Sequence, residues 1–223
     1  IKITALRYER GLLVSKATTH YQLLVGEAGD ATLPDLSFST REEIYHGPIP
    51  LAGWGVPGVP MTLAGAVIRQ TLDPESSNWT RELKTLYSGQ EPMVGIAQVG
   101  FDGASNAHVT MPPLTLNNVQ DLQTFKFSGL QGQFQTAPRG TAVQGKMVVA
   151  SLEAIGKPAT HEATQPATAG SQIHLRDLAV TANQRKGVFD LMLGESNLKI
   201  AELRVQDPSS STPMVFTDLG MDA

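Results

Sequence analysis

The chain has no cysteine among its 223 residues. Disulfides, thiolate nucleophiles and cysteine-ligated metal sites are therefore excluded together. The absence does not fix the cellular compartment, because a chain without thiols is equally safe in an oxidising periplasm and in a reducing cytosol.

Long runs of one kind of residue are also missing. No apolar run approaches the roughly 18 residues of a membrane-spanning helix, and no charged segment followed by an apolar one marks a signal peptide. No run of Lys and Arg could neutralise a track of phosphates, and the formal net charge is -4, so we expect no nucleic acid partner. Because the chain starts at Ile1 without a methionine and already in a strand pattern, we expect any membrane anchor to lie in an upstream segment.

Aromatic residues are few and turn-forming residues are many. The chain has 7 Phe, 4 Tyr and 2 Trp against 21 Gly and 14 Pro, which favours many strands joined by turns over long packed helices. Its 41% hydrophobic content is typical of a folded protein. We predict a mainly β (α+β) protein whose residues 1–223 form a single extended domain.

Alternation of polar and apolar residues places the strands. Residues 2–10 and 12–25 alternate around Gly11 and predict an opening hairpin. A strand at 37–46 ends at Gly47-Pro48, and the prolines and glycines of 47–60 predict irregular structure. Later strands are predicted at 93–101, 104–111, 122–135, 141–155, 172–182, 188–193, 196–206 and 214–221, with tight turns at Asp102-Gly103 and Gly194-Glu195 and a mobile loop at about 156–170.

Two helices are predicted before residue 93, and we expect both to pack on one face of a long curved antiparallel sheet. The first, at about 62–72, places four residues on one face at helical spacing: Ala64, Val67, Ile68 and Thr71. The second, at about 74–88, follows the start signal Asp73-Pro74-Glu75 and ends before Gly89. Its apolar face consists of Trp79, Leu83, Leu86 and Tyr87.

One pattern of apolar spacing recurs in four of the later strands. Each copy has two apolar residues two positions apart and a third after a three-residue step: Phe125, Phe127 and Leu130; Ile173, Leu175 and Leu178; Leu198, Ile200 and Leu203; Met214, Phe216 and Leu219. Such a step changes the face that the apolar residues occupy, as a β-bulge or a strand crossing between two buried faces would do. Gly129 suits a bulge in the first copy, whereas the others have Asp177, Glu202 and Asp218 there.

Two glycine motifs match nucleotide-binding patterns by spacing alone. Residues 53–58 fit G-x-G-x-x-G, but Pro57 removes an amide and no βαβ unit surrounds the motif. Residues 140–146 match most of a P-loop, but Met147 stands where Ser or Thr would bind magnesium. We interpret both as turn and strand glycines and expect no cofactor.

Catalytic and metal-ligating side chains form no recognisable set. The five histidines show no metal-binding spacing: His20, His46, His108, His161 and His174. Glu42 and Glu43 point to opposite faces of a strand, and we expect solvation to be their role. We predict no catalytic residue and no metal ligand, and the ligand-binding residues stay unknown. A site assembled across strands is left open, with His46 the histidine to watch.

The two tryptophans have different expected roles. Trp79 lies on the apolar face of the second helix and is expected in the core. Trp54 lies in a Gly/Pro loop, where it either covers the end of the sheet or contacts a ligand, and we favour the cover.

Several short segments together resemble the YdgA/YihF-type proteins of Gram-negative bacteria. They are Ile44-Tyr45-His46-Gly47-Pro48-Ile49-Pro50-Leu51, the helical pair, Gly89-Gln90-Glu91-Pro92 and Val99-Gly100-Phe101-Asp102-Gly103. The resemblance spans about 37–223 and implies a periplasmic protein of unknown function, longer than this chain and anchored in the inner membrane by an N-terminal segment. It implies no catalytic residues.

These observations lead to one expected function and two alternatives. We expect a non-enzymatic protein of the periplasm or cell envelope that binds a lipid, an envelope polymer or a protein partner along its sheet, because curved sheets with an apolar face bury acyl chains readily. The alternatives are an envelope hydrolase with a cross-strand active site and a purely structural assembly scaffold, including a homo-oligomer.

Overall fold

A computed structural model describes residues 2–23, 36–119, 122–157, 170–187, 191–207, 210 and 212–222. By their internal contacts these residues fall into two compact units, which are described separately. Unit 1 consists of residues 1–109 and 136–140, and unit 2 of residues 110–135 and 141–223. The single extended domain stays a prediction, and the predicted loop at 156–170 lies mostly outside the described residues.

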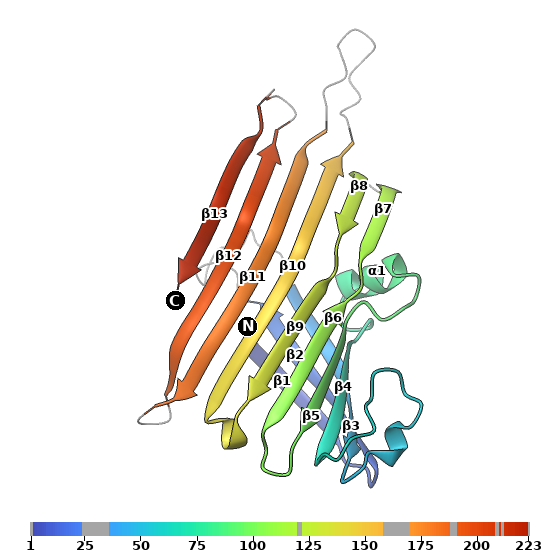
Figure 1. Ribbon diagram of the computed structural model, residues 1–223. Coiled ribbons are helices and arrows are strands. Elements are labelled where there is room, and N and C mark those ends of the chain that lie inside the picture. Colours follow the sequence, from blue (N-terminus) through green and yellow to red (C-terminus); the bar gives the residue numbers. More distant parts are fainter. Residues whose placement is uncertain are drawn as a thin grey trace. The chain divides into compact units, whose positions relative to one another are not determined.

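Unit 1 is built on an antiparallel sheet whose strands follow each other in chain order (Figure 1). The strands are β1 (Lys2–Glu9), β2 (Val14–Leu23), β3 (Leu36–His46), β4 (Ala66–Leu72), β5 (Val94–Val99) and β6 (Ser105–Met111). The predicted opening hairpin is confirmed, because β1 pairs antiparallel with β2. The turn at Asp102-Gly103 is also confirmed: the Gly100 amide bonds the Ala104 carbonyl, and Gly103 has the positive φ of 82° that this turn requires.

The core of unit 1 is small and lies on one face of β3 and β4. Tyr45 and Val67 are directly opposite each other on these strands, and both are buried together with Ala64. The irregular segment that follows β3 covers them, with Val56 and Val59 packed on this cluster and one short 3-10 turn, η1 (Leu51–Gly53). The prediction of irregular structure at 47–60 is therefore confirmed. Trp54 is 76% exposed, so its predicted role as a cover for the sheet is wrong.

The described residues contain one α-helix, α1 (Asn78–Leu86), in unit 1. It begins later than predicted, because Asp73 closes a turn by accepting the Glu75 amide, and Ser77 is the residue that caps the helix. Ser77 accepts the Thr80 amide at 3.2 Å, and the Thr80 hydroxyl accepts the Ser77 amide at 3.2 Å, which is a reciprocal capping box. The stop at Gly89 is confirmed by its φ of 79° and its amide bond to the Lys84 carbonyl.

The predicted helix at 62–72 is wrong, and so is the predicted fold with two helices packed on one face, because residues 66–72 form β4. Val67 points into the core beside Tyr45, whereas Ile68 borders a cavity on the opposite face. A strand that is buried on both faces carries adjacent apolar residues, and this spacing imitates a helical face. The β-branched residues Val67, Ile68 and Thr71 then favour the strand.

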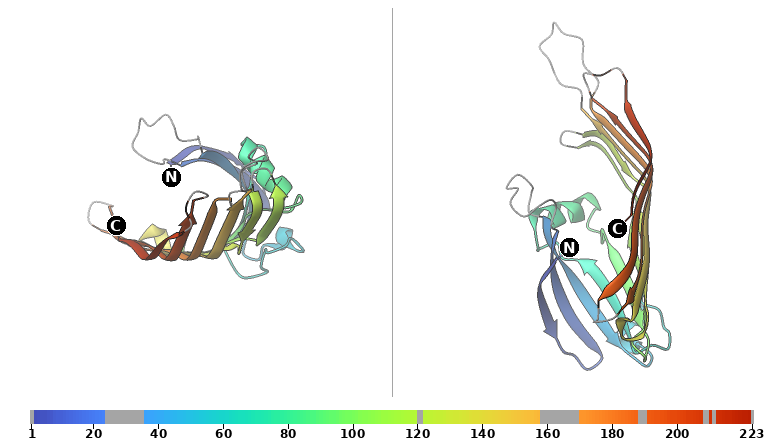
Figure 2. Two further views of the ribbon diagram at one scale, coloured as in Figure 1. Left: turned by 90° about the horizontal axis from the view of Figure 1, so that it is seen from above. Right: turned by 90° about the vertical axis from the view of Figure 1, so that its left-hand side faces the viewer.

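Unit 2 consists of antiparallel strands, and the described residues of this unit contain no helix. Its strands are β7 (Leu114–Val119), β8 (Leu122–Phe127), β9 (Leu130–Thr136), β10 (Ala142–Gly156), β11 (Gln172–Lys186), β12 (Met192–Gln206) and β13 (Met214–Asp222); a second 3-10 turn, η2 (Pro138–Gly140), belongs to unit 1. The order is β9-β10-β11-β12-β13, and β8 pairs with both β10 and β7. Figure 2 shows β10 to β13 as one layer of long strands lying side by side.

The strands of unit 2 differ from the prediction in three places. β7 was not predicted, and the predicted strand at 122–135 is divided at Gly129 into β8 and β9. The predicted turn at Gly194-Glu195 is wrong, because both residues pair with β11 inside the long strand β12. Of the predicted strand at 188–193, residues 188–190 lie outside the described residues.

The three-residue step of the repeated pattern coincides with left-handed backbone. Gly129, Asp177 and Asp218 have φ values of 93°, 51° and 52°, whereas Glu202 is not among the positive-φ residues of the described chain. The pairing of β11 with its neighbours continues in the same register on both sides of Asp177, so the step inserts no residue and is not a bulge. A residue in this conformation interrupts the alternation of faces, which leaves Leu175 and Leu178 on the same face of β11.

Candidate functional site

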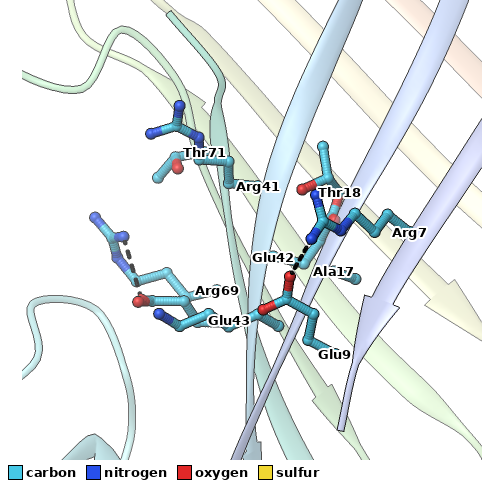
Figure 3. A pocket seen from close by; sticks show the side chains of 10 residues that line it. Arg7, Glu9, Ala17, Thr18, Arg41, Glu42, Glu43, Arg69 and Thr71 are labelled. Carbon is cyan, nitrogen blue, oxygen red and sulfur yellow. Dashed lines mark ion pairs between the residues drawn. The ribbon is translucent and has the colours of Figure 1, made fainter. Parts of the chain in front are cut away.

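Two cavities lie on opposite faces of the sheet of unit 1, and they are named here by their walls. The polar cavity has a volume of about 390 Å³ and is lined by Arg7, Glu9, Lys16, Ala17, Thr18, Arg41, Glu42, Glu43, Arg69 and Thr71 (Figure 3). The apolar cavity has a volume of about 270 Å³ and is lined by Ala17, Thr19, Tyr21, Glu42, Ile44, Ile68, Gln70, Gly95, Ala97 and Ala107. Glu42 and Ala17 border both cavities, because β2 and β3 separate them.

Ion pairs neutralise most charges of the polar cavity. Arg7 pairs with Glu9 at 3.0 Å, and Arg69 pairs with Glu43 at 3.8 Å (Figure 3). Arg41 pairs with Asp73 at 2.5 Å. The cavity therefore presents a balanced, partly exposed set of charges, which gives weak attraction for an ion of either sign.

Tyr45 connects the polar cavity to the core of unit 1. Its hydroxyl donates a hydrogen bond of 2.8 Å to Glu43 Oε2. Burial of the ring raises the pKa of Tyr45 to about 12, and the hydrogen bond to the Glu43 carboxylate adds to this effect. The phenol is therefore protonated at physiological pH and serves as a hydrogen-bond donor to Glu43.

The structure separates Glu42 from Glu43 as the sequence predicts, but the predicted role of Glu42 is wrong. Glu43 borders the polar cavity, whereas Glu42 borders both cavities. Glu42 is only 8% exposed, so it is not a solvated surface acid. Alternation along the strand predicts that Glu42 and Glu43 lie on opposite faces. Whether either acid is buried depends on the side chains of the neighbouring strands, which the sequence does not reveal.

Two cross-strand serine–histidine pairs form in unit 1 that sequence spacing could not show. Ser15 Oγ lies 2.8 Å from His46 Nε2, and Ser39 Oγ lies 2.6 Å from His20 Nδ1. Ser15 is fully buried and also accepts the Gly11 amide at 3.1 Å, so its oxygen is held within the hairpin. Within the described residues neither histidine bonds a carboxylate, which leaves both pairs without the third member of a catalytic triad.

The remaining sequence candidates lie apart from these cavities. The residues of the P-loop-like motif from Ala142 onward are strand β10, as interpreted from the sequence. Gly55 and Gly58 adopt positive φ in the irregular loop, where no βαβ unit is present among the described residues. His161 lies outside the described residues. The described residues contain no group of three His, Cys, Asp or Glu side chains able to hold a metal ion.

Unit 2 carries a regular set of apolar side chains, called here the apolar rows. Residues that lie directly opposite each other on neighbouring strands share a face of the sheet. Six strands contribute to each of two such rows: Leu114, Phe127, Leu152, Leu175, Leu203 and Phe216 in the first, and Leu116, Phe125, Ala154, Ile173, Val205 and Met214 in the second. Two shorter rows follow beyond the step: Val149, Leu178, Ile200 and Leu219, and Met147, Val180, Leu198 and Met221.

The apolar rows are incompletely covered. At the edge strand β13, Met214, Phe216 and Met221 are 56%, 44% and 63% exposed. Ile173, inside the sheet, is 44% exposed. The other residues of the two six-residue rows are half-buried, so unit 2 exposes its apolar side chains mainly at β13 and at Ile173.

The opposite face of the first two rows is charged. Lys126 pairs with Glu153 at 3.3 Å across β8 and β10, and Arg176 pairs with Glu202 at 3.7 Å across β11 and β12. Val215, next to Phe216 on β13, lies opposite Arg204 on this charged face. The sheet of unit 2 thus has one apolar and one charged side.

Fold and sites together define a β-sheet protein with a polar cavity, an apolar cavity and an exposed apolar sheet face. The whole chain, residues 1–223, matches the model of a family of bacterial proteins of unknown function (DUF945), and it belongs to that family. No curated protein and no solved structure matches the chain. No helix among the described residues is long and apolar enough to cross a membrane.

Proposed function

We propose that the protein is a non-enzymatic protein of the cell envelope whose unit 2 sheet binds the acyl chain of a lipid along the apolar rows. The observation that carries the proposal is the pair of six-residue apolar rows, half-buried along most of their length and exposed at Ile173, Met214 and Phe216, with charged side chains on the other face. An apolar partner that covers these rows is favourable, because it removes apolar surface from water and each Å² removed contributes about 25 cal/mol of free energy.

The form of the rows favours an acyl chain over a globular partner. Neighbouring strands lie about 4.8 Å apart, so six strands give an apolar track of roughly 24 Å. One leaflet of a bilayer has a hydrocarbon depth of roughly 15 Å, so an extended acyl chain fits along one row. Each buried methylene contributes about 0.8 kcal/mol, and a linear ligand gains this contact along its whole length.

The proposed location is the periplasm, with the full-length protein anchored to the inner membrane. Two observations support it: membership of a bacterial family and the resemblance of several segments to YdgA/YihF-type envelope proteins. In that location acyl chains of lipids are abundant, so they are available to bind the apolar face of the sheet. Fractionation of cells that produce the full-length protein, with antibody detection in each fraction, tests the location.

The binding proposal is tested with a fluorescent fatty acid and two variants of the edge strand. Phe216 and Val215 are neighbours with nearly equal exposure, 44% and 47%, but they belong to opposite faces. We expect Phe216→Asp to weaken binding of the fatty acid at least fivefold and Val215→Asp to leave it unchanged. Equal effects of the two substitutions, or no binding by the unmodified protein, contradict the proposal.

The exposed edge of β13 favours an assembly scaffold as a second candidate. Every residue of β13 is exposed, and the strand contains no Lys, Arg or Pro to prevent pairing with another strand. In this case a second copy would add its own edge strand to β13. Light scattering should then show a dimer that the double substitution Val215→Lys and Thr217→Lys disrupts, whereas a monomer at all concentrations rejects this candidate.

A further inference from the structure

Glu42 on β3 is a buried acid with one oxygen unsatisfied. Its side chain is 8% exposed. Oε1 accepts hydrogen bonds from the Thr40 hydroxyl and from Gln70 Nε2, the latter at 3.0 Å. Oε2 is buried and has no hydrogen-bond partner. Buried polar atoms of this kind are rare, and each one calls for an explanation.

The carboxylate of Glu42 faces the apolar cavity. Ala17 and Gln70 are directly opposite Glu42 on the neighbouring strands, and all three line this cavity. Directly opposite residues share a face of the sheet. Glu42 therefore contributes to the wall of this cavity, while Oε2 itself is covered by neighbouring atoms.

Positive charge is absent from the lining of the apolar cavity. Its ten lining residues include no Lys, Arg or His. The basic residues of the same strands, Lys16, Arg41 and Arg69, line the polar cavity, which Glu42 also borders, and none of them forms an ion pair with Glu42 in the part of the chain that the structure describes. A buried carboxylate without an ion-pair partner is unfavourable, and a cationic ligand would offset that cost.

The remainder of the wall is apolar and made of small side chains. Ile44 and Ile68 lie opposite each other on β3 and β4, and Ala97 lies opposite Ile68 on β5. Gly95, opposite Gln70, leaves room that a larger residue would fill, since a Cβ there would lie 3.3 Å from Gln70 Oε1. The volume of about 270 Å³ is just below the usual range for drug-sized ligands, which suits a small one.

We propose that the apolar cavity of unit 1 binds a ligand that carries a protonated primary amine on a short apolar body. The Glu42 side chain turns toward the cavity to expose Oε2 to the ammonium group, and the apolar body contacts Ile44, Ile68 and Ala97. This site lies in unit 1, so it is independent of acyl-chain binding on the rows of unit 2.

The test is an NMR titration that follows the methyl resonances of Ile44 and Ile68. The probes are hexylammonium chloride and, as its neutral match, 1-hexanol. We expect hexylammonium to shift both resonances with saturation, and 1-hexanol to bind at least tenfold more weakly. No shift with hexylammonium, or equal affinity for the two probes, overturns the proposal.

Matched variants locate the interaction. Glu42→Gln keeps the acceptor for Thr40 and Gln70 but removes the charge, and it should weaken hexylammonium binding at least tenfold. Glu43→Gln makes the same change one residue along, in the polar cavity, and should leave the affinity unchanged. Unchanged affinity in Glu42→Gln overturns the proposal.

A second variant keeps the test valid if Glu42→Gln disturbs folding. Ala107→Leu fills the apolar cavity from β6 without touching a charge. It should abolish the hexylammonium shifts of Ile44 and Ile68 in a protein whose remaining spectrum is unchanged. Retained binding in this folded variant also overturns the proposal.

Discussion

Asp177 on β11 and Asp218 on β13 share the same left-handed backbone, with φ values of 51° and 52°. Both lie opposite Ala201 of β12, because the pairs on either side, with Ile200 and with Glu202, are in register with β11 and with β13. The two aspartates therefore mark one line across the sheet of unit 2. At this line the spacing of the apolar residues changes from two positions to three. The apolar residues before and after the line therefore stay on the same face of the sheet.

The left-handed backbone at this line predicts how glycine substitutions act. Any residue with a side chain is strained in this conformation by about 1 kcal/mol, whereas Gly is not. Asp177→Gly should therefore leave the free energy of unfolding unchanged or raise it. Ala150→Gly, on the neighbouring strand β10, should lower it by about 1 kcal/mol. Urea unfolding measures both, and an equal loss in the two variants would show that Asp177 is not left-handed.

Gly129, between β8 and β9, is expected to tolerate substitution less than Asp177 or Asp218. Its φ is 93°, and a Cβ at this position would lie 2.7 Å from the Met111 carbonyl oxygen. Gly129→Ala should therefore destabilise the protein by about 2 kcal/mol in the same urea experiment. A stable Gly129→Ala variant would contradict the backbone described between β8 and β9.

Much of the fold was predictable from the sequence, since alternation and turn residues act locally. The opening hairpin and the Asp102-Gly103 turn follow from patterns within a few residues. The helix predicted at 62–72 failed because Val67 is buried on one face of β4 while Ile68 is half-buried on the other, which depends on what covers each face of the strand.

The candidate sites were less predictable, because they form between strands distant in sequence. Glu42 and Gln70 are 28 residues apart and meet only through the pairing of β3 and β4. The repeated apolar spacing was visible in the sequence, but its effect on the faces depends on the φ of Asp177 and Asp218. Asp enters this conformation more readily than most residues, which is the one local signal available.

The capping box of α1 predicts a specific loss of stability. Ser77→Ala removes the acceptor for the Thr80 amide, and Thr80 is buried, so water cannot replace it. The free energy of unfolding should fall by about 1 kcal/mol. Asn78→Ala, one residue further and exposed, should change it by less than about 0.5 kcal/mol. Thermal or urea unfolding distinguishes the two, and equal losses would argue against Ser77 as the cap.

Tyr45 predicts a loss of stability at alkaline pH. Its pKa rises from 10.0 to about 12 in the folded protein, so the folded state holds the phenolic proton more tightly than the unfolded chain. This contribution is complete below pH 10 and is lost as the pH rises from about 10 to about 12. The stability difference between the wild type and Tyr45→Phe should shrink by about 1 kcal/mol per pH unit in this window. A difference that does not vary with pH contradicts the raised pKa.

Substitution of Ser15, which pairs with His46, distinguishes a structural role of this pair from a role in hydrolysis. Ser15 Oγ also accepts a hydrogen bond from the Tyr8 hydroxyl at 3.0 Å, so Ser15→Ala should lower the free energy of unfolding by about 1–3 kcal/mol. We expect no turnover of p-nitrophenyl acetate above the background of free histidine. Turnover that Ser15→Ala abolishes in a folded protein would instead establish the hydrolase alternative.

Photolabelling with a fatty acid that carries a diazirine on its acyl chain tests acyl-chain binding most directly. Peptide mapping after irradiation should place the label on residues of the apolar rows in β11 to β13, such as Leu175, Leu203 and Phe216. Residues of the charged face, such as His174 and Arg204, should stay unlabelled. Labelling spread evenly over both faces, or confined to unit 1, would contradict the proposed function.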